Sequence, residues 1–168
     1  RRPGQHLAVP GEGAAVAAHV GMHDAGPKAR RLRDDWLALL QALEPCGPLM
    51  ALTRNETTVH EKTGVYRNLS GNAVMGLALG EEIDLRLFFS HWHAGFAVTE
   101  LAANPGNRVE PSLQFFDGTG QAVHKIYVRQ ATDLAAWHAV IDAFEDSALP
   151  PPVFDADASP ATTTADEA

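Results

Sequence analysis

The chain of 168 residues has little cysteine, few aromatic residues and no long apolar run. Its single cysteine, Cys46, excludes an intramolecular disulfide framework and a CxxC metal motif, and it fits a reducing cytoplasm. Apolar runs stay below the roughly 20 residues that a membrane-spanning helix needs. The first residues show no signal-peptide pattern. We therefore expect a cytoplasmic protein with no membrane span.

Basic residues are also in the minority. The chain has 13 Lys and Arg against 21 Asp and Glu, which gives a net charge of −8. An acidic chain is a poor candidate for binding phosphate backbones, so we expect no nucleic-acid partner. Gly-rich phosphate loops, nucleophile elbows and paired zinc-ligand motifs are missing. We therefore expect a single globular domain, and its sequence shows no standard catalytic motif.

Three segments differ in composition. Residues 1–28 are rich in Gly, Ala and Pro, and we expect a weakly structured or helical N-terminal segment. Residues 29–149 carry the apolar periodicity of one folded domain. Residues 150–168 are dominated by Pro, Ala, Thr and Asp and contain no Lys or Arg. That composition predicts a disordered linker or tail.

Helical periodicity occurs twice in the central domain. From Ala29 to Leu43, apolar residues recur on one stripe, and the three arginines at 30, 31 and 33 are interpreted as a solvated face. Thr132 is a plausible N-cap for a second helix that reaches Phe144. Both helices are expected to pack on a sheet.

Strand patterns fill the interval between the helices. We expect strands at Leu49–Thr53, Thr57–Arg67 (with a possible bulge at Gly64) and Ala73–Leu79. Ser112–Phe116 and Ala122–Val128 predict a hairpin that turns at Asp117–Gly120. The order predicts an α+β fold: a largely antiparallel sheet with helices packed on one face.

The stretch Ile83–Glu100 holds the candidate functional residues. Arg86 has apolar neighbours on both sides in the sequence, which suggests a buried charge. A guanidinium keeps its proton, so it needs an anionic or oxygen-rich partner. That partner is either a structural carboxylate or a bound ligand. The plainer alternative is an arginine on a solvent-facing edge.

Histidines are numerous, eight in all. His91 and His93 would point to the same face of a strand, as two ligands of one metal would. No third ligand is identifiable, so no dedicated zinc or iron site is assigned. His60 has the pattern of a surface strand residue.

Several separate motifs resemble one family. They are Thr53-Arg54-Asn55-Glu56, Val59-His60-Glu61-Lys62-x-Gly64-x-Tyr66, Asp84-Leu85-Arg86-Leu87-Phe88, Trp92, Leu113-Gln114-Phe115-Phe116-Asp117, Gly120-x-Ala122-x-His124-Lys125-x-Tyr127 and Thr132-Asp133-x-x-Ala136-Trp137. They occur in the order and spacing of the hemin-degrading factors of the HemS/HmuS type. The resemblance runs from about Ala29 to Phe144, and more loosely from Leu7.

The resemblance implies a b-type haem as ligand. Members of the family have two similar halves, and this chain resembles the first, so we expect a fragment or a half-length relative. The iron-binding histidine belongs to the second half. The first half is expected to supply a distal arginine, here Arg86, with Phe88 as a neighbouring wall. His60 is a weaker candidate for a second or transient ligand.

Three functions follow from the resemblance. The first is haem binding and trafficking in haem-iron acquisition, with delivery to a haem oxygenase-type enzyme. The second is haem degradation by the protein itself, although no flavin or nicotinamide motif is visible. The third is a structural half that shapes the haem cleft of a second HemS-like half, on the same chain or in a dimer.

Overall fold

The structure is a computed structural model that describes residues 12–17, 29–55, 58–80, 82–99 and 111–155. Its helices are α1 (Glu12–Ala17), α2 (Trp36–Gln41) and α3 (Leu134–Phe144), with short 3-10 turns η2 (Glu44–Cys46) and η3 (Phe89–His91). Its strands are β1 (Ala29–Leu32), β2 (Leu49–Asn55), β3 (Thr58–Gly64), β4 (Ser70–Gly71), β5 (Gly76–Leu79), β6 (Asp84–Leu87), β7 (Ala94–Val98), β8 (Ser112–Phe116) and β9 (Ala122–Val128).

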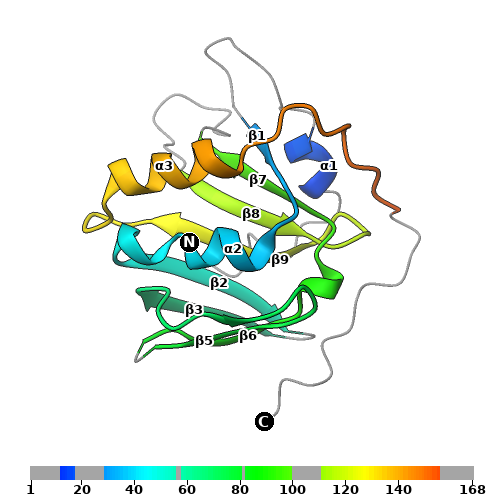
Figure 1. Cartoon of the computed structure of the whole chain (residues 1–168). Helices are drawn as coiled ribbons and strands as arrows, with labels where there is room; N and C mark the ends of the chain where they lie inside the picture. The colour runs from blue at the N-terminus through cyan, green and yellow to red at the C-terminus, as the bar shows by residue number, and fades with distance from the viewer. Residues whose placement is uncertain (1–11, 18–28, 56–57, 81, 100–110, 156–168) are drawn as a thin grey trace.

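The strands form two antiparallel sheets. Six of them pair in the order β1-β7-β8-β9-β2-β3, and β4-β5-β6 form a separate small sheet. In Figure 1, α2 and α3 lie across the near side of the larger sheet, and β5 and β6 lie below β3. The expected α+β fold with a largely antiparallel sheet is confirmed.

The central strands β7, β8 and β9 of the larger sheet are buried on both faces, whereas the edge strand β3 is largely exposed. One face packs against α2, α3 and the inner side of the small sheet, around large side chains such as Trp36, Phe115 and Trp137. The opposite face carries Phe96 and Phe116, and Val16 of α1 packs there with an exposed fraction of 1%. Alternation of side chains along each strand sends successive residues into these two clusters. The small sheet therefore belongs to the same packed body as the helices.

The helix expected over Ala29–Leu43 is wrong in its first half. Ala29–Leu32 is strand β1, which pairs with β7, and the helix is limited to Trp36–Gln41. The apolar stripe predicted from the spacing is nevertheless buried in one cluster, from Leu32 through Leu43. Pairing with β7, a strand far along the chain that local periodicity does not encode, decides the backbone conformation here.

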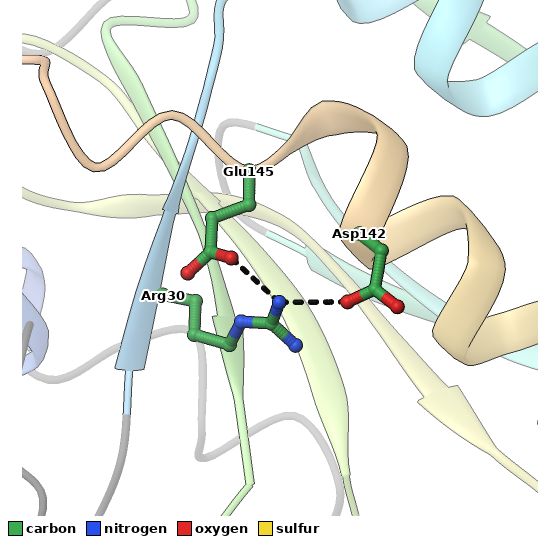
Figure 2. A network of polar contacts seen from close by, with 3 residues as sticks. All are labelled: Arg30, Asp142 and Glu145. Atoms are coloured by element: carbon green, nitrogen blue, oxygen red, sulfur yellow. Dashed lines mark hydrogen bonds and ion pairs between the residues drawn. The ribbon is translucent and has the colours of Figure 1, made fainter.

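Arg30 of β1 and Arg33, which follows it, do not form a solvated helix face but contact the end of α3. The Arg30 guanidinium donates to Asp142 at 2.8 Å and to Glu145 at 2.6 Å, as Figure 2 shows. Arg33 donates to the carbonyl oxygen of Ala143, and its guanidinium lies 4.5 Å from the centre of the Phe144 ring. The hydrogen bond between their side chains, aided by their opposite charges, raises the pKa of Arg30 and lowers that of Glu145. These contacts fix β1 against the last turn of α3.

The predicted strands and hairpin are confirmed with shifted ends. The β8–β9 hairpin turns where Asp117 Oδ1 accepts the backbone N–H of Thr119 and of Gln121, and β8 pairs with β7. Gly64 is not a bulge, because the β2–β3 register runs unbroken from Leu49–Gly64 to Asn55–Thr58. A Cβ on Gly64 would lie 2.6 Å from the side chain of Glu82, so glycine permits close approach of the β5–β6 turn.

The N-cap of α3 is Asp133, one residue later than expected. Its carboxylate accepts the backbone N–H of Ala136 at 3.1 Å. The Thr132 hydroxyl instead donates to the carbonyl oxygen of Pro48 at 2.6 Å, and it accepts the N–H of Arg129. Thr132 thus ties the start of α3 to the loop before β2. No helix in the described part of the chain is long and apolar enough to cross a membrane.

Residues 150–155, which belong to the predicted tail, lie against the folded domain. Phe154 contacts Phe116 and His93, with ring centres 6.2 and 5.6 Å apart. The backbone N–H of Asp155 donates to the carbonyl oxygen of Gly118 at 2.8 Å. The remainder of the predicted tail, 156–168, and most of the N-terminal segment lie outside the described residues. Within that segment, Glu12–Ala17 forms the short helix α1.

Candidate functional site

The candidate residues Arg86 and Phe88 lie on and just beyond the small sheet. Its inner side consists of Ala78, Leu87 and the partly buried Leu85, which pack into the main core. A Cβ on Gly76 would lie 2.6 Å from the ring of Phe89, so glycine lets β5 press against that ring. The inner side therefore fixes the sheet to the body, and its other side faces outward.

Arg86 is exposed, which agrees with the alternative of a solvent-facing arginine and not with a buried charge. In β6 the side chains alternate, so Leu85 and Leu87 face inward whereas Asp84 and Arg86 face outward. Apolar neighbours in sequence do not surround a strand residue in space. The Arg86 side chain therefore lies on the outer side of the small sheet.

Phe88 follows the last residue of β6 and precedes η3. Its ring is half-buried and stacks on His91, with ring centres 6.3 Å apart and planes inclined by 26°. Phe88 and Arg86 thus lie two residues apart in sequence, at the end of β6. That they form neighbouring parts of one binding site stays a prediction.

His60 lies in the other sheet. It is exposed on β3, opposite Thr53 of β2, and its Nε2 lies 3.3 Å from the hydroxyl of Thr58. The structure therefore places this weaker candidate on the six-stranded sheet, whereas Arg86 and Phe88 come from the small sheet and the turn that follows it. A ligand role of His60 stays a prediction.

His91 and His93 do not form a pair of ligands on one strand face. His91 lies in η3 beside Phe88, whereas His93 precedes β7 and donates from Nε2 to the carbonyl oxygen of Val153 at 2.8 Å. The 3-10 turn breaks the alternation that the prediction assumed. Among the described residues, no group of three or more His, Cys, Asp or Glu side chains is placed to hold a metal ion.

His124, which the sequence analysis left without a role, is fully buried between the two sheets. Its Nδ1 lies 3.0 Å from the Thr53 hydroxyl, and its Nε2 lies 2.8 Å from the Tyr66 hydroxyl. The ring stacks on Trp92, with centres 5.7 Å apart. Burial lowers the pKa of His124 to about 3. Both ring nitrogens have partners, so this is a structural histidine rather than a metal ligand.

The outer side of the small sheet carries aliphatic side chains beside Arg86. Leu77 and Leu79 lie there with Arg86, and Leu79 has an exposed fraction of 54%. Flat apolar ligands with acidic groups need this combination of aliphatic surface and a fixed positive charge. Sequence reasoning missed the two leucines, although their alternation with Gly76 and Ala78 indicates an outward face.

Comparison with known proteins gives the family of the chain. Residues 11–144 match the model of the haemin-degrading HemS.ChuX domain, and the chain belongs to this family. It is 44% identical over 120 residues to the hemin transport protein HmuS of Yersinia pestis, covering 71% of this chain and 34% of that protein. The chain thus spans about a third of the length of this curated relative.

Solved structures give the same assignment. The heme-binding protein PhuS of Pseudomonas aeruginosa superposes with a TM-score of 0.74 and 39% identity, over 91% of this chain and 43% of that one. ChuS, an E. coli heme oxygenase, gives a TM-score of 0.73 and 32% identity, over 90% and 44% of the two chains. The fold described above is therefore the fold of part of these longer haem proteins.

Proposed function

We propose that this protein binds haem in the cytoplasm and carries it during haem-iron acquisition. The observation that carries the proposal is the outward position of Arg86 beside Leu77 and Leu79, in a chain of the HemS.ChuX family. Similarity to a hemin transport protein and to a heme-binding protein supports it. A carrier needs a specific but reversible site, which one charged group on an apolar surface provides.

Arg86 supplies the polar contact of the proposed site. A guanidinium does not ligate iron, but it donates hydrogen bonds to an iron-bound water or to a propionate. The bound haem is of the b type, held without covalent attachment. Phe88 forms a wall beside Arg86, and His60 remains the weaker candidate for a transient ligand. The axial histidine is supplied by a second HemS-like half, on the same chain or in a dimer.

Titration of haem into the 168-residue chain tests the proposal. We expect a saturable shift of the Soret band and quenching of tryptophan fluorescence, with a fixed stoichiometry. A titration that matches haem in buffer would overturn the proposal. That result would support a structural half, whose role is to shape the haem cleft of its partner.

Haem degradation is a second candidate, favoured by the similarity to ChuS, which is a heme oxygenase. An oxygenating enzyme needs an electron source and a distal donor, and Arg86 can serve as the donor. Haem-loaded protein is incubated with a reductant, with and without catalase. Loss of the Soret band that persists with catalase supports enzymatic turnover. Loss that catalase abolishes reflects peroxide chemistry and supports the carrier.

A further inference from the structure

The outer side of the small sheet has a defined register. Ser70, Leu77 and Arg86 are cross-strand neighbours in one row across β4, β5 and β6. The next row places Leu79 opposite Asp84. The two leucines are therefore central, with charged side chains along one edge and a hydroxyl on the other.

Leu77 and Leu79 are held outward. Their neighbours Gly76 and Ala78 are buried against the core, and Ala78 has an exposed fraction of 0%. Rotating β5 to bury the leucines would expose Ala78 and move Gly76 from the Phe89 ring. Leu77 and Leu79 therefore remain on the same face as Arg86 and do not turn into the core.

Spacing within the sheet sets what this surface can contact. Side chains directly opposite across two strands have Cβ atoms about 4.5–5.5 Å apart, and same-face residues along a strand lie about 7 Å apart. Leu77 is therefore within one side-chain length of Arg86, with Leu79 beside it. A flat ring seated over Arg86 must cover Leu77.

We infer that Leu77 and Leu79 bind the flat face of the porphyrin, and that they recognise the ring rather than the metal. This inference rests on the proposed haem binding and adds its selectivity. Aliphatic side chains contact ring carbon atoms irrespective of the central ion. The site therefore accepts metal-free protoporphyrin IX as well as haem, whereas Arg86 acts on the ligand at the iron or on a propionate.

The test compares binding of haem and of metal-free protoporphyrin IX to the wild-type chain, Leu77→Glu and Leu134→Glu. Leu134 is the matched control, because it is 49% exposed but lies on α3. We expect Leu77→Glu to weaken the binding of both porphyrins by about tenfold to a hundredfold, as loss of one leucine contact with added charge implies. Leu134→Glu should change neither affinity by more than about twofold.

Controls separate the possible failures. Circular dichroism and thermal unfolding verify that each variant is folded. If Leu77→Glu does not fold, Leu77→Ser replaces it in the binding test. Wild-type protein that binds haem but not protoporphyrin overturns ring recognition and leaves haem binding intact. Unchanged affinities of Leu77→Glu for both porphyrins also overturn ring recognition. If, in addition, the wild type is a dimer and Leu77→Glu is a monomer, the face is a contact between copies of the chain. Wild-type protein that binds neither porphyrin overturns both proposals.

Discussion

The Nε2 atom of His124 lies 2.8 Å from the hydroxyl of Tyr66, in the buried layer between the two sheets. Tyr66 follows β3, and His124 lies on β9. A neutral imidazole has one N–H and one acceptor nitrogen, so one of the two hydroxyls around it donates and the other accepts. Protonation would make both nitrogens donors in a site that excludes water. The ring is consequently held in its neutral form.

We predict a loss of stability in mild acid that depends on His124. Its pKa falls from 6.5 to about 3 on folding, so the unfolded chain binds more protons between these values. Its contribution to stability is complete above pH 6.5 and is lost as the pH falls towards 3. At pH 5 the stability lost, relative to a pH above 6.5, is about 2 kcal/mol. Urea unfolding at pH 7.5 and pH 5 measures the difference.

The matched variants are His124→Asn and His138→Asn. His138 is exposed on α3 and should leave the pH dependence as in the wild type. His124→Asn should be less stable at pH 7.5 but should lose less stability on acidification. Equal losses in all three proteins would show that His124 does not titrate as proposed.

Tyr66→Phe should destabilise the fold by about 1–3 kcal/mol, because it leaves a buried ring nitrogen without its partner. Thr58→Val is the control, since the contact of Thr58 with His60 lies at the surface. That variant should stay within about 0.5 kcal/mol of the wild type. Denaturant unfolding at pH 7.5 compares them, and a neutral Tyr66→Phe would refute the hydrogen-bonded role.

Arg30→Gln should lower the free energy of unfolding by about 1 kcal/mol, less at high salt, because the pairs are partly exposed. Of the two acceptors, Glu145 has a side-chain exposure of 31% against 68% for Asp142. We therefore expect Glu145→Gln to cost more than Asp142→Asn. Salt-dependent thermal unfolding of the three variants checks this order. The reverse order would show that burial does not govern this network.

Elements are predicted correctly from the sequence where the residues of the turn itself determine the structure. The β8–β9 hairpin is an example, because Asp117 and Gly120 mark its turn. Prediction from the sequence fails at β1, where Arg30–Leu32 has helical periodicity but pairs with β7. That pairing depends on residues far along the chain, which a local pattern does not contain.

The candidate site shows the same division. Motifs identify Arg86 and Phe88, but the apolar sequence neighbours of Arg86 leave both a buried and a solvent-facing arginine open, because neighbours in sequence need not be neighbours in space. Alternation of Asp84, Leu85, Arg86 and Leu87 does indicate which residues share a side. Which side packs on the core depends on Phe89 and on the larger sheet. His124 was left without a role since its partners Thr53 and Tyr66 come from other segments.

Phe154→Ala should release residues 153–155 from the domain. The amide hydrogen of Asp155 bonds to Gly118, so we expect measurable protection from exchange in the wild type. Loss of the contacts of Phe154 with Phe116 and His93 should remove that protection. Val153→Ala is the control, because Val153 is 82% exposed. Hydrogen exchange of the Asp155 amide is measured by NMR in the three proteins. An unprotected Asp155 amide in the wild type would contradict the packing of residues 153–155 on the domain.

Arg86→Ala in the haem-loaded protein tests the central claim most directly, by titrating azide at the iron and following the Soret band. Loss of a charge-assisted hydrogen bond is worth about 1.5–3 kcal/mol, so we predict azide binding about tenfold to a hundredfold weaker. Haem affinity should change less, and Arg86→Lys should restore only part of the loss, because an ammonium lacks the planar fork. An unchanged azide curve and Soret spectrum, with a lowered melting temperature, would contradict the account and leave Arg86 a structural role alone.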